Sequence, residues 1–116
     1  MNVKRGNVVL VDLEPVKGSE QGKVRPCIVV QSDFANRYSP TTIVIPLTST
    51  ILDKAYPTTV VVHATTESGL RNLSTALCNQ PRTVSVKDRI VKIMGLLGAD
   101  TMRRVGMALK ASMQLD

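Results

Sequence analysis

The chain has 116 residues, of which 43% are hydrophobic, so residues 1–116 are enough for one compact domain and too few for two ordinary ones. Fifteen lysines and arginines against nine acids give a net charge of +6, which favours polyanionic partners. No apolar run approaches the ~20 residues of a membrane span, and the N-terminus lacks a signal-peptide pattern. We therefore expect a cytoplasmic protein that binds no membrane.

Short strands and polar loops alternate through the first part of the chain. Residues 7–13 (NVVLVDL) are predicted to form a strand, because they are rich in β-branched residues and Pro15 blocks a simple continuation. A polar loop over residues 14–24 leads into a second strand over residues 25–31. Pro26 stands at the entrance to that strand, where its missing N–H is least harmful.

A turn-rich segment separates this strand from the third. Within residues 32–41, Asp33 is expected to cap a single helical turn that runs to Arg37. The third strand is predicted over residues 42–47, with Pro46 marking an edge or a bulge near its end.

The second half continues with short segments and then changes period. The expected segments are a strand over 59–63, a strand over 75–79, an interruption over 80–83, a turn or single helical turn over 85–89 and a last strand over 90–94 ended by Gly95. From Gly98 or Asp100 onward, apolar residues recur at helical spacing, namely Met102, Val105, Leu109 and Met113. This pattern predicts an amphipathic helix whose methionines face the barrel or a partner subunit.

Five to seven short strands followed by one helix predict a mainly β fold, a small and partly open antiparallel barrel with a helix packed on it. Cys27 and Cys78 lie in apolar stretches and are expected to pack as reduced thiols. The single histidine, His63, excludes mechanisms that need two from one chain. Asp12 and Glu14 share strand parity, but nothing beside them completes a carboxylate metal site, so we predict no metal or cofactor.

Residues 18–31, GSEQGKVRPCIVVQ, form the most informative stretch. Two glycines frame a polar loop that delivers Arg25 to the mouth of an apolar strand. A mobile loop ending in an arginine held by a rigid strand suits an anion site, and a surface hairpin with an incidental arginine suits the pattern equally well. The loop lacks the Lys-Ser/Thr signature of a P-loop. We expect it to be poorly ordered in the free protein.

Arginines and hydroxyls gather at the predicted strand ends. They are Arg25, Arg82, Thr48 and Ser49, with Ser19, Glu20 and Gln21 in the loop. Such groups can stabilise the extra charge of a pentacovalent phosphate, where one well-placed donor is worth ~3 kcal/mol. RNA carries its own nucleophile, the 2′-hydroxyl. With one Phe and two Tyr, the composition argues against a platform for base stacking, so binding would rest on phosphate contacts and hydrogen bonds.

The run RGNVVLVDLEPVKGSEQGKVRPCIVVQSD, followed by NRYSPTTIVIPLTS and QPRTVS, resembles the MazF/PemK (Kid) family of type II toxin endoribonucleases over essentially the whole chain. The resemblance implies an SH3-like (PemK/CcdB-like) barrel homodimer. Such a dimer cleaves single-stranded RNA, usually mRNA, at a short sequence without metal, leaving 2′,3′-cyclic phosphate and 5′-hydroxyl ends. The resemblance assigns the catalytic roles to Arg25 and Thr48. Residues expected to line an RNA groove across the dimer are Ser19, Glu20, Gln21, Ser49, Gln80 and Arg82.

The family also implies a cognate antitoxin, whose disordered acidic segment covers the groove and suits the charge of +6. One departure is visible, since Asn7 stands where the family usually has aspartate. Two alternatives remain open. One is a non-catalytic toxin-fold module that inhibits a protein target such as gyrase, and the other is a basic RNA-binding barrel that binds without cleaving.

Overall fold

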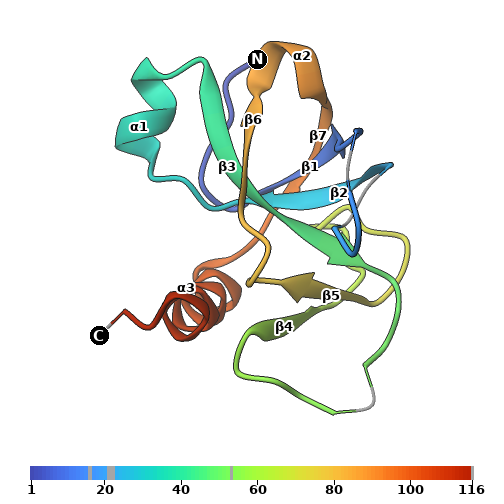
Figure 1. The fold of residues 1–116 in the computed structure, drawn as a ribbon. Helices are drawn as coiled ribbons and strands as arrows, with labels where there is room; N and C mark the ends of the chain where they lie inside the picture. Colours follow the sequence, from blue (N-terminus) through green and yellow to red (C-terminus); the bar gives the residue numbers. More distant parts are fainter. Residues whose placement is uncertain (16, 21–22, 53, 116) are drawn as a thin grey trace.

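The structure, a computed structural model, describes residues 1–15, 17–20, 23–52 and 54–115. Within these ranges the elements follow one another along the chain as Figure 1 shows. Their bounds are β1 Asn7–Asp12, β2 Val24–Val29, α1 Asp33–Tyr38, β3 Thr41–Thr48, β4 Thr59–Val62, β5 Ser74–Leu77, β6 Arg82–Ser85, α2 Val86–Arg89, β7 Ile90–Leu96 and α3 Ala99–Met113. Among the described residues, no helix has both the length and the apolar character to cross a membrane.

The strands form one mostly antiparallel sheet in the order β4-β5-β3-β2-β1-β7, and β6 pairs with β3 off this path. One edge of β3 pairs with β2, while its other edge is shared by two strands. β6 takes the first half of that edge, from Thr41 to Val44, and β5 takes its end, at Leu47 and Thr48. The sheet does not close, so the prediction of a mainly β, partly open barrel with a C-terminal helix is confirmed.

Alternating side chains of β1, β2 and β3 supply two separate cores, one on each face of the sheet. Val8, Ile28 and Ile45 belong to the core that α3 covers, to which the helix contributes Val105 and Ala108. The other core lies on the opposite face and consists of Val3, Val9, Val11, Leu13, Cys27, Val29, Val44, Val84 and Ile90. Successive β-branched residues point to opposite faces and are buried on both, which holds the central strands firmly in place.

Three expectations about strand boundaries were wrong. Residues 82–85 form strand β6, although an interruption was expected over 80–83 and a turn from 85, because the first half of the β3 edge is free to accept them. Pro46 lies in an interior strand, in the gap between the β6 and β5 pairings, where its missing N–H removes no bond to either strand. β7 continues through Gly95 to Leu96, because both residues still pair with β1, and position 95 requires glycine since a Cβ there would lie 2.2 Å from the Glu67 carbonyl oxygen.

The helices also differ in detail from the sequence expectations. Ser32, not Asp33, caps α1, because its hydroxyl accepts the Ala35 N–H at 3.3 Å. On α3, Met102 packs against the core, whereas Met107 and Met113 are 65% and 55% exposed. The core-facing stripe of α3 is therefore narrower than the methionine spacing implied.

Candidate functional site

Arg25 is the second residue of β2 and is half-buried opposite Val11 of β1. Strand β2 pairs with β3 up to Cys27 opposite Pro46, so two further steps in this register lead from Arg25 to Thr48. The predicted catalytic pair therefore occupies adjoining strand ends. The pairing itself is formed by β-branched and apolar residues that are buried behind the site.

Thr48 is the last residue of β3 and pairs with Thr75 of β5. Its Oγ1 accepts the backbone N–H of Thr50 at 3.2 Å. A hydroxyl that accepts from the backbone still has its own proton to donate. Thr48 can therefore present a hydrogen-bond donor to a phosphate oxygen at the strand end.

Two clefts contain the other predicted site residues. The first has a volume of about 620 Å³ and is lined by Ser19, Glu20, Gln80 and Arg82. The second, of about 410 Å³, is lined by Arg25 and Ser49. The predicted set is thus divided between two neighbouring surfaces. Gln21 lies outside the described residues, and the expected disorder of its loop stays a prediction.

The cleft beside Arg25 holds two further cations, Arg71 and Lys92, and no acid lines it among the described residues. Sequence reasoning assigned neither of them a role. Arg71 comes from a loop distant in sequence, and Lys92 is placed by the pairing of β7 with β1, where it faces Leu10. The one signal in the sequence that could have indicated Lys92 is a lysine inside the apolar run IVKIM.

Two arginines hold the base of the β1–β2 loop. Arg82 donates to the carbonyl of Leu13, and Arg89 donates to the carbonyls of Asp12, at 3.0 Å, and Glu14. Part of the Arg82 guanidinium is therefore already hydrogen-bonded to the protein backbone. An arginine has five N–H donors, so Arg82 can still bind a second group. Arg89 was missed because nothing local in its short helical turn indicates these contacts.

The carboxylates at the loop are engaged with backbone amides. Asp12 accepts the Glu14 N–H at 3.0 Å, and Glu14 accepts the Lys23 N–H at 2.6 Å. Glu20 accepts the Lys17 N–H at 2.6 Å. The two acids considered for a metal site are thus turn-stabilising groups. No cluster of three or more potential metal ligands occurs in the part of the chain that the structure describes.

Cys27 lies close enough to Arg25 and Arg82 for both positive charges to act on its thiol. Burial raises the pKa of its thiol to about 12, opposed by the positive charges of Arg25 and then Arg82. Burial likewise raises the pKa of Cys78 to about 11. Both cysteines are free and buried, as expected of packing residues. The exposed His63 lines a different cleft from Arg25.

The departure at Asn7 is accommodated by hydrogen bonds that use both ends of its amide. The Oδ1 atom accepts the Lys4 N–H at 2.6 Å, and Nδ2 donates to the Gly95 carbonyl at 3.1 Å. An aspartate could keep the first bond but not the second. Asn7 begins β1, so this change lies at the opposite end of the strand from Val11 and Arg25.

The fold and these residues define a small, open antiparallel β protein with arginines and hydroxyls at adjoining strand ends. A family model for PemK-like, MazF-like toxins of type II toxin–antitoxin systems matches residues 4–113. The chain belongs to this family. Endoribonuclease EndoA of Bacillus subtilis is 43% identical over 115 residues, which cover 99% of this chain and 97% of that protein.

Solved structures share the fold. MazF from Deinococcus radiodurans has a TM-score of 0.80 at 22% identity, and the match covers 98% of each chain. An endoribonuclease in complex with its cognate antitoxin from Mycobacterial species has a TM-score of 0.79 at 22% identity, covering 98% of this chain and 97% of that one.

Proposed function

We propose that this protein is an endoribonuclease toxin that cleaves single-stranded RNA, mRNA above all, at a short sequence without a metal ion. The observation that carries the proposal is the cleft that Arg25 shares with Ser49, Arg71 and Lys92, next to the strand end where the β2–β3 register leads to Thr48. Membership of the toxin family and 43% identity to a protein named an endoribonuclease support the same reaction.

The reaction is an internal transesterification. The RNA 2′-oxygen forms a bond to phosphorus while the bond to the 5′-oxygen breaks, giving a 2′,3′-cyclic phosphate and a 5′-hydroxyl. The 2′-hydroxyl loses a proton and the departing oxygen gains one, so the step is balanced without a co-reactant. Arg25 stabilises the pentacovalent charge and donates toward the departing oxygen, and Thr48 donates to a phosphate oxygen. We assign no base role to the guanidinium, because it retains its proton in proteins.

The neighbouring cleft is assigned to the RNA on either side of the scissile bond. Ser19, Glu20, Gln80 and Arg82 supply donors and acceptors for bases and phosphates there, with Gln21 and Ser49 as further contacts. We infer that a homodimer completes this groove. Exposed apolar residues on α3, such as Met107, and nearby Tyr56 and Val61, offer surface for a second subunit.

A cognate antitoxin is the second partner in the proposal. Structures of MazE–MazF from Deinococcus radiodurans, at 22% identity or less, show the same fold in proteins crystallised with such a partner. A net charge of +6 suits an acidic segment that competes with RNA for the cationic clefts. The toxin would act in the cytoplasm, where its mRNA substrate is found.

Incubating the purified protein with single-stranded RNA in EDTA tests the proposal. We expect discrete fragments with 2′,3′-cyclic phosphate ends, and no cleavage of DNA of the same sequence, because DNA lacks the 2′-hydroxyl. The Arg25→Ala protein serves as the control for contaminating nuclease. Intact RNA in the wild-type reaction would instead favour a binding module or an inhibitor of a protein target.

A further inference from the structure

Helix α1 carries an exposed pair of aromatic rings at the opposite end of β2 and β3 from Arg25. Phe34 and Tyr38 are 75% and 73% exposed, and their ring centroids lie 5.6 Å apart in an edge-to-face arrangement. These are two of the three aromatic residues in the chain. None of the residues of α1 is buried, so the helix contributes nothing to either core.

Polar contacts nevertheless hold α1 firmly in place. Asn36 accepts from the buried Thr42 hydroxyl at 2.7 Å and from Gln31 at 2.9 Å, and it donates to the Gln31 carbonyl at 3.1 Å. Asp33 accepts the backbone N–H of Arg5 at 2.7 Å. The aromatic pair is therefore presented on a positioned surface, which lowers the entropic cost of binding a ligand there.

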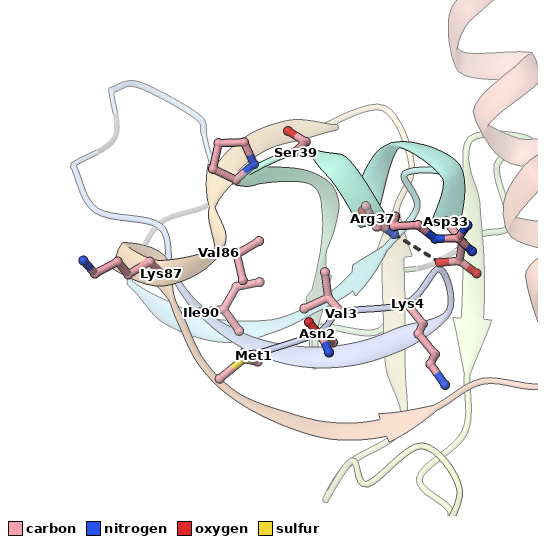
Figure 2. Close-up of a pocket in the computed structure, with 12 residues that line it drawn as sticks. Met1, Asn2, Val3, Lys4, Asp33, Arg37, Ser39, Val86, Lys87 and Ile90 are labelled. Atoms are coloured by element: carbon pink, nitrogen blue, oxygen red, sulfur yellow. Dashed lines mark hydrogen bonds between the residues drawn. The ribbon is translucent and has the colours of Figure 1, made fainter.

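A basic cleft of about 750 Å³ adjoins the helix (Figure 2). In that view Lys87 and Lys4 lie at opposite ends, with the apolar side chains of Val86, Ile90 and Val3 between them. Arg37 contributes a third cation from α1.

The cations of this cleft outnumber the acids that line it. The single acid that lines it among the described residues is Asp33, which is already bound to the N–H groups of Arg5 and Asn36. The ion pairs found in the described ranges involve Asp100, Arg103 and Arg104 on α3, far along the chain from this cleft. Three cations against one carboxylate among the described lining residues leave the cleft with a net positive charge that suits an anionic ligand.

The cleft and the aromatic pair are continuous around α1. With ~100° of rotation per residue, Arg37 falls between the stripe of Asp33 and Asn36, which lines the cleft, and the stripe of Phe34 and Tyr38. A ligand on this helix meets phosphate-binding cations and stacking surfaces side by side. That combination is how single-stranded nucleic acid is bound without sequence preference.

We propose that the α1 aromatic pair, Phe34 and Tyr38, together with Lys4, Arg37 and Lys87, forms an exosite for single-stranded RNA. Bases stack on the two rings, and the cations contact the phosphates between them. The proposal rests on the proposed function, because it takes single-stranded RNA as the substrate. It also revises the expectation that a chain with so few aromatics lacks a stacking surface.

The exosite is remote from the reaction. Figure 1 shows α1 at the end of the sheet away from the last residues of β3, and the strand rise separates Thr41 from Thr48 by roughly 20 Å. Only RNA that extends several nucleotides past the scissile bond reaches both sites. The exosite therefore tightens the binding of long RNA and leaves the chemical step unchanged.

Length-dependent binding tests this directly. The probes are two 2′-O-methyl RNAs, which cannot form the cyclic phosphate, of ~5 and ~16 nucleotides, spanning the footprints of small single-strand-binding folds. For the Phe34→Ala/Tyr38→Ala protein we expect the Kd of the long probe to rise at least about fivefold and that of the short probe to stay unchanged. Tyr38→Phe keeps both rings and should bind as wild type.

The charge component has its own measurement. Replacing Arg37 or Lys87 with Gln should reduce the slope of log K against log salt by about 0.7 per lost phosphate contact for the long probe. Lys110→Gln is the matched control, an exposed lysine on α3, and should leave that slope unchanged. These substitutions remove exposed side chains, so the fold should survive them.

Three results would overturn the inference. They are equal losses for short and long probes, no loss for either, and weakened binding of an acidic peptide or of a second subunit with RNA binding intact. Failure of the proposed function looks different. Wild-type protein that binds long RNA through α1 but cleaves none would refute the nuclease and keep the exosite, whereas cleavage without any effect of α1 would do the reverse.

Discussion

Arg89 offers a sharp test of how the β1–β2 loop is supported. Its guanidinium donates to two carbonyls, of Asp12 at 3.0 Å and of Glu14, which lie 77 and 75 residues away in sequence. A hydrogen bond to a charged group contributes about 1.5–3 kcal/mol when buried, and one of these bonds is exposed. We therefore expect Arg89→Ala to lower the free energy of unfolding by about 2 kcal/mol.

Urea unfolding measures this loss, and Arg103→Ala provides the control. Arg103 contacts the carboxylate of Asp100, but both side chains are 70% exposed, so removing Arg103 should change stability by less than about 0.5 kcal/mol. Arg89→Lys keeps the charge but cannot bridge two carbonyls as a planar fork does, and should recover less than half of the loss. If Arg89→Ala costs no more than Arg103→Ala, the loop is not held by this arginine.

The remaining predictions concern the site itself. Arg25→Ala should reduce cleavage by at least ~10³-fold while circular dichroism and RNA binding stay close to wild type, and equal cleavage would exclude its catalytic role. Thr48→Val removes the hydroxyl at nearly constant volume and should lower kcat ~10–100-fold, with rescue by Thr48→Ser. Burial raises the pKa of Cys27 from its ordinary 9.0 to about 12, so the folded protein holds a proton that the unfolded chain releases above pH 9. The contribution of Cys27 to stability should therefore be constant below pH 9 and become destabilising as the pH rises from 9 toward 12, and Cys27→Ala should reduce the fall in stability over that alkaline range in urea titrations.

The β-branched runs and the glycines and prolines between them sufficed to predict most strands and the open barrel, and the helical spacing of apolar residues sufficed to predict the terminal helix. β6 was missed because its pairing depends on β3, whose outer edge is divided between two strands. The sequence of residues 82–85 alone does not show that half of the β3 edge is available for pairing. The prediction that Pro46 marks an edge or a bulge was wrong for the same reason. A proline is tolerated in this interior strand because Pro46 lies in the gap between the β6 and β5 pairings.

The positions of the candidate site residues could be predicted where a sequence motif contains them, but not where the strand pairing brings distant residues together. Arg25 and Thr48 lie at the ends of β2 and β3, and the predicted bounds of both strands at these ends agree with the structure to within one residue. Arg71 and Lys92 reach the same cleft from a loop and from the edge strand β7, which only the β1–β7 pairing brings alongside. Arg82 was chosen for its neighbours in sequence, and part of its guanidinium binds the Leu13 carbonyl.

The distribution of acids explains how a moderate net charge produces strongly cationic clefts. Most of the nine acids are bound within the protein, to backbone N–H groups or to nearby side chains. These acids are Asp12, Glu14, Glu20, Asp33, Asp88 and Asp100. Carboxylates used as local acceptors are turned toward turns and helix ends, where they stabilise the backbone. Two clefts show the result: Arg25, Arg71 and Lys92 line one without an acid among the described residues, and Lys4, Arg37 and Lys87 line the other with Asp33 alone.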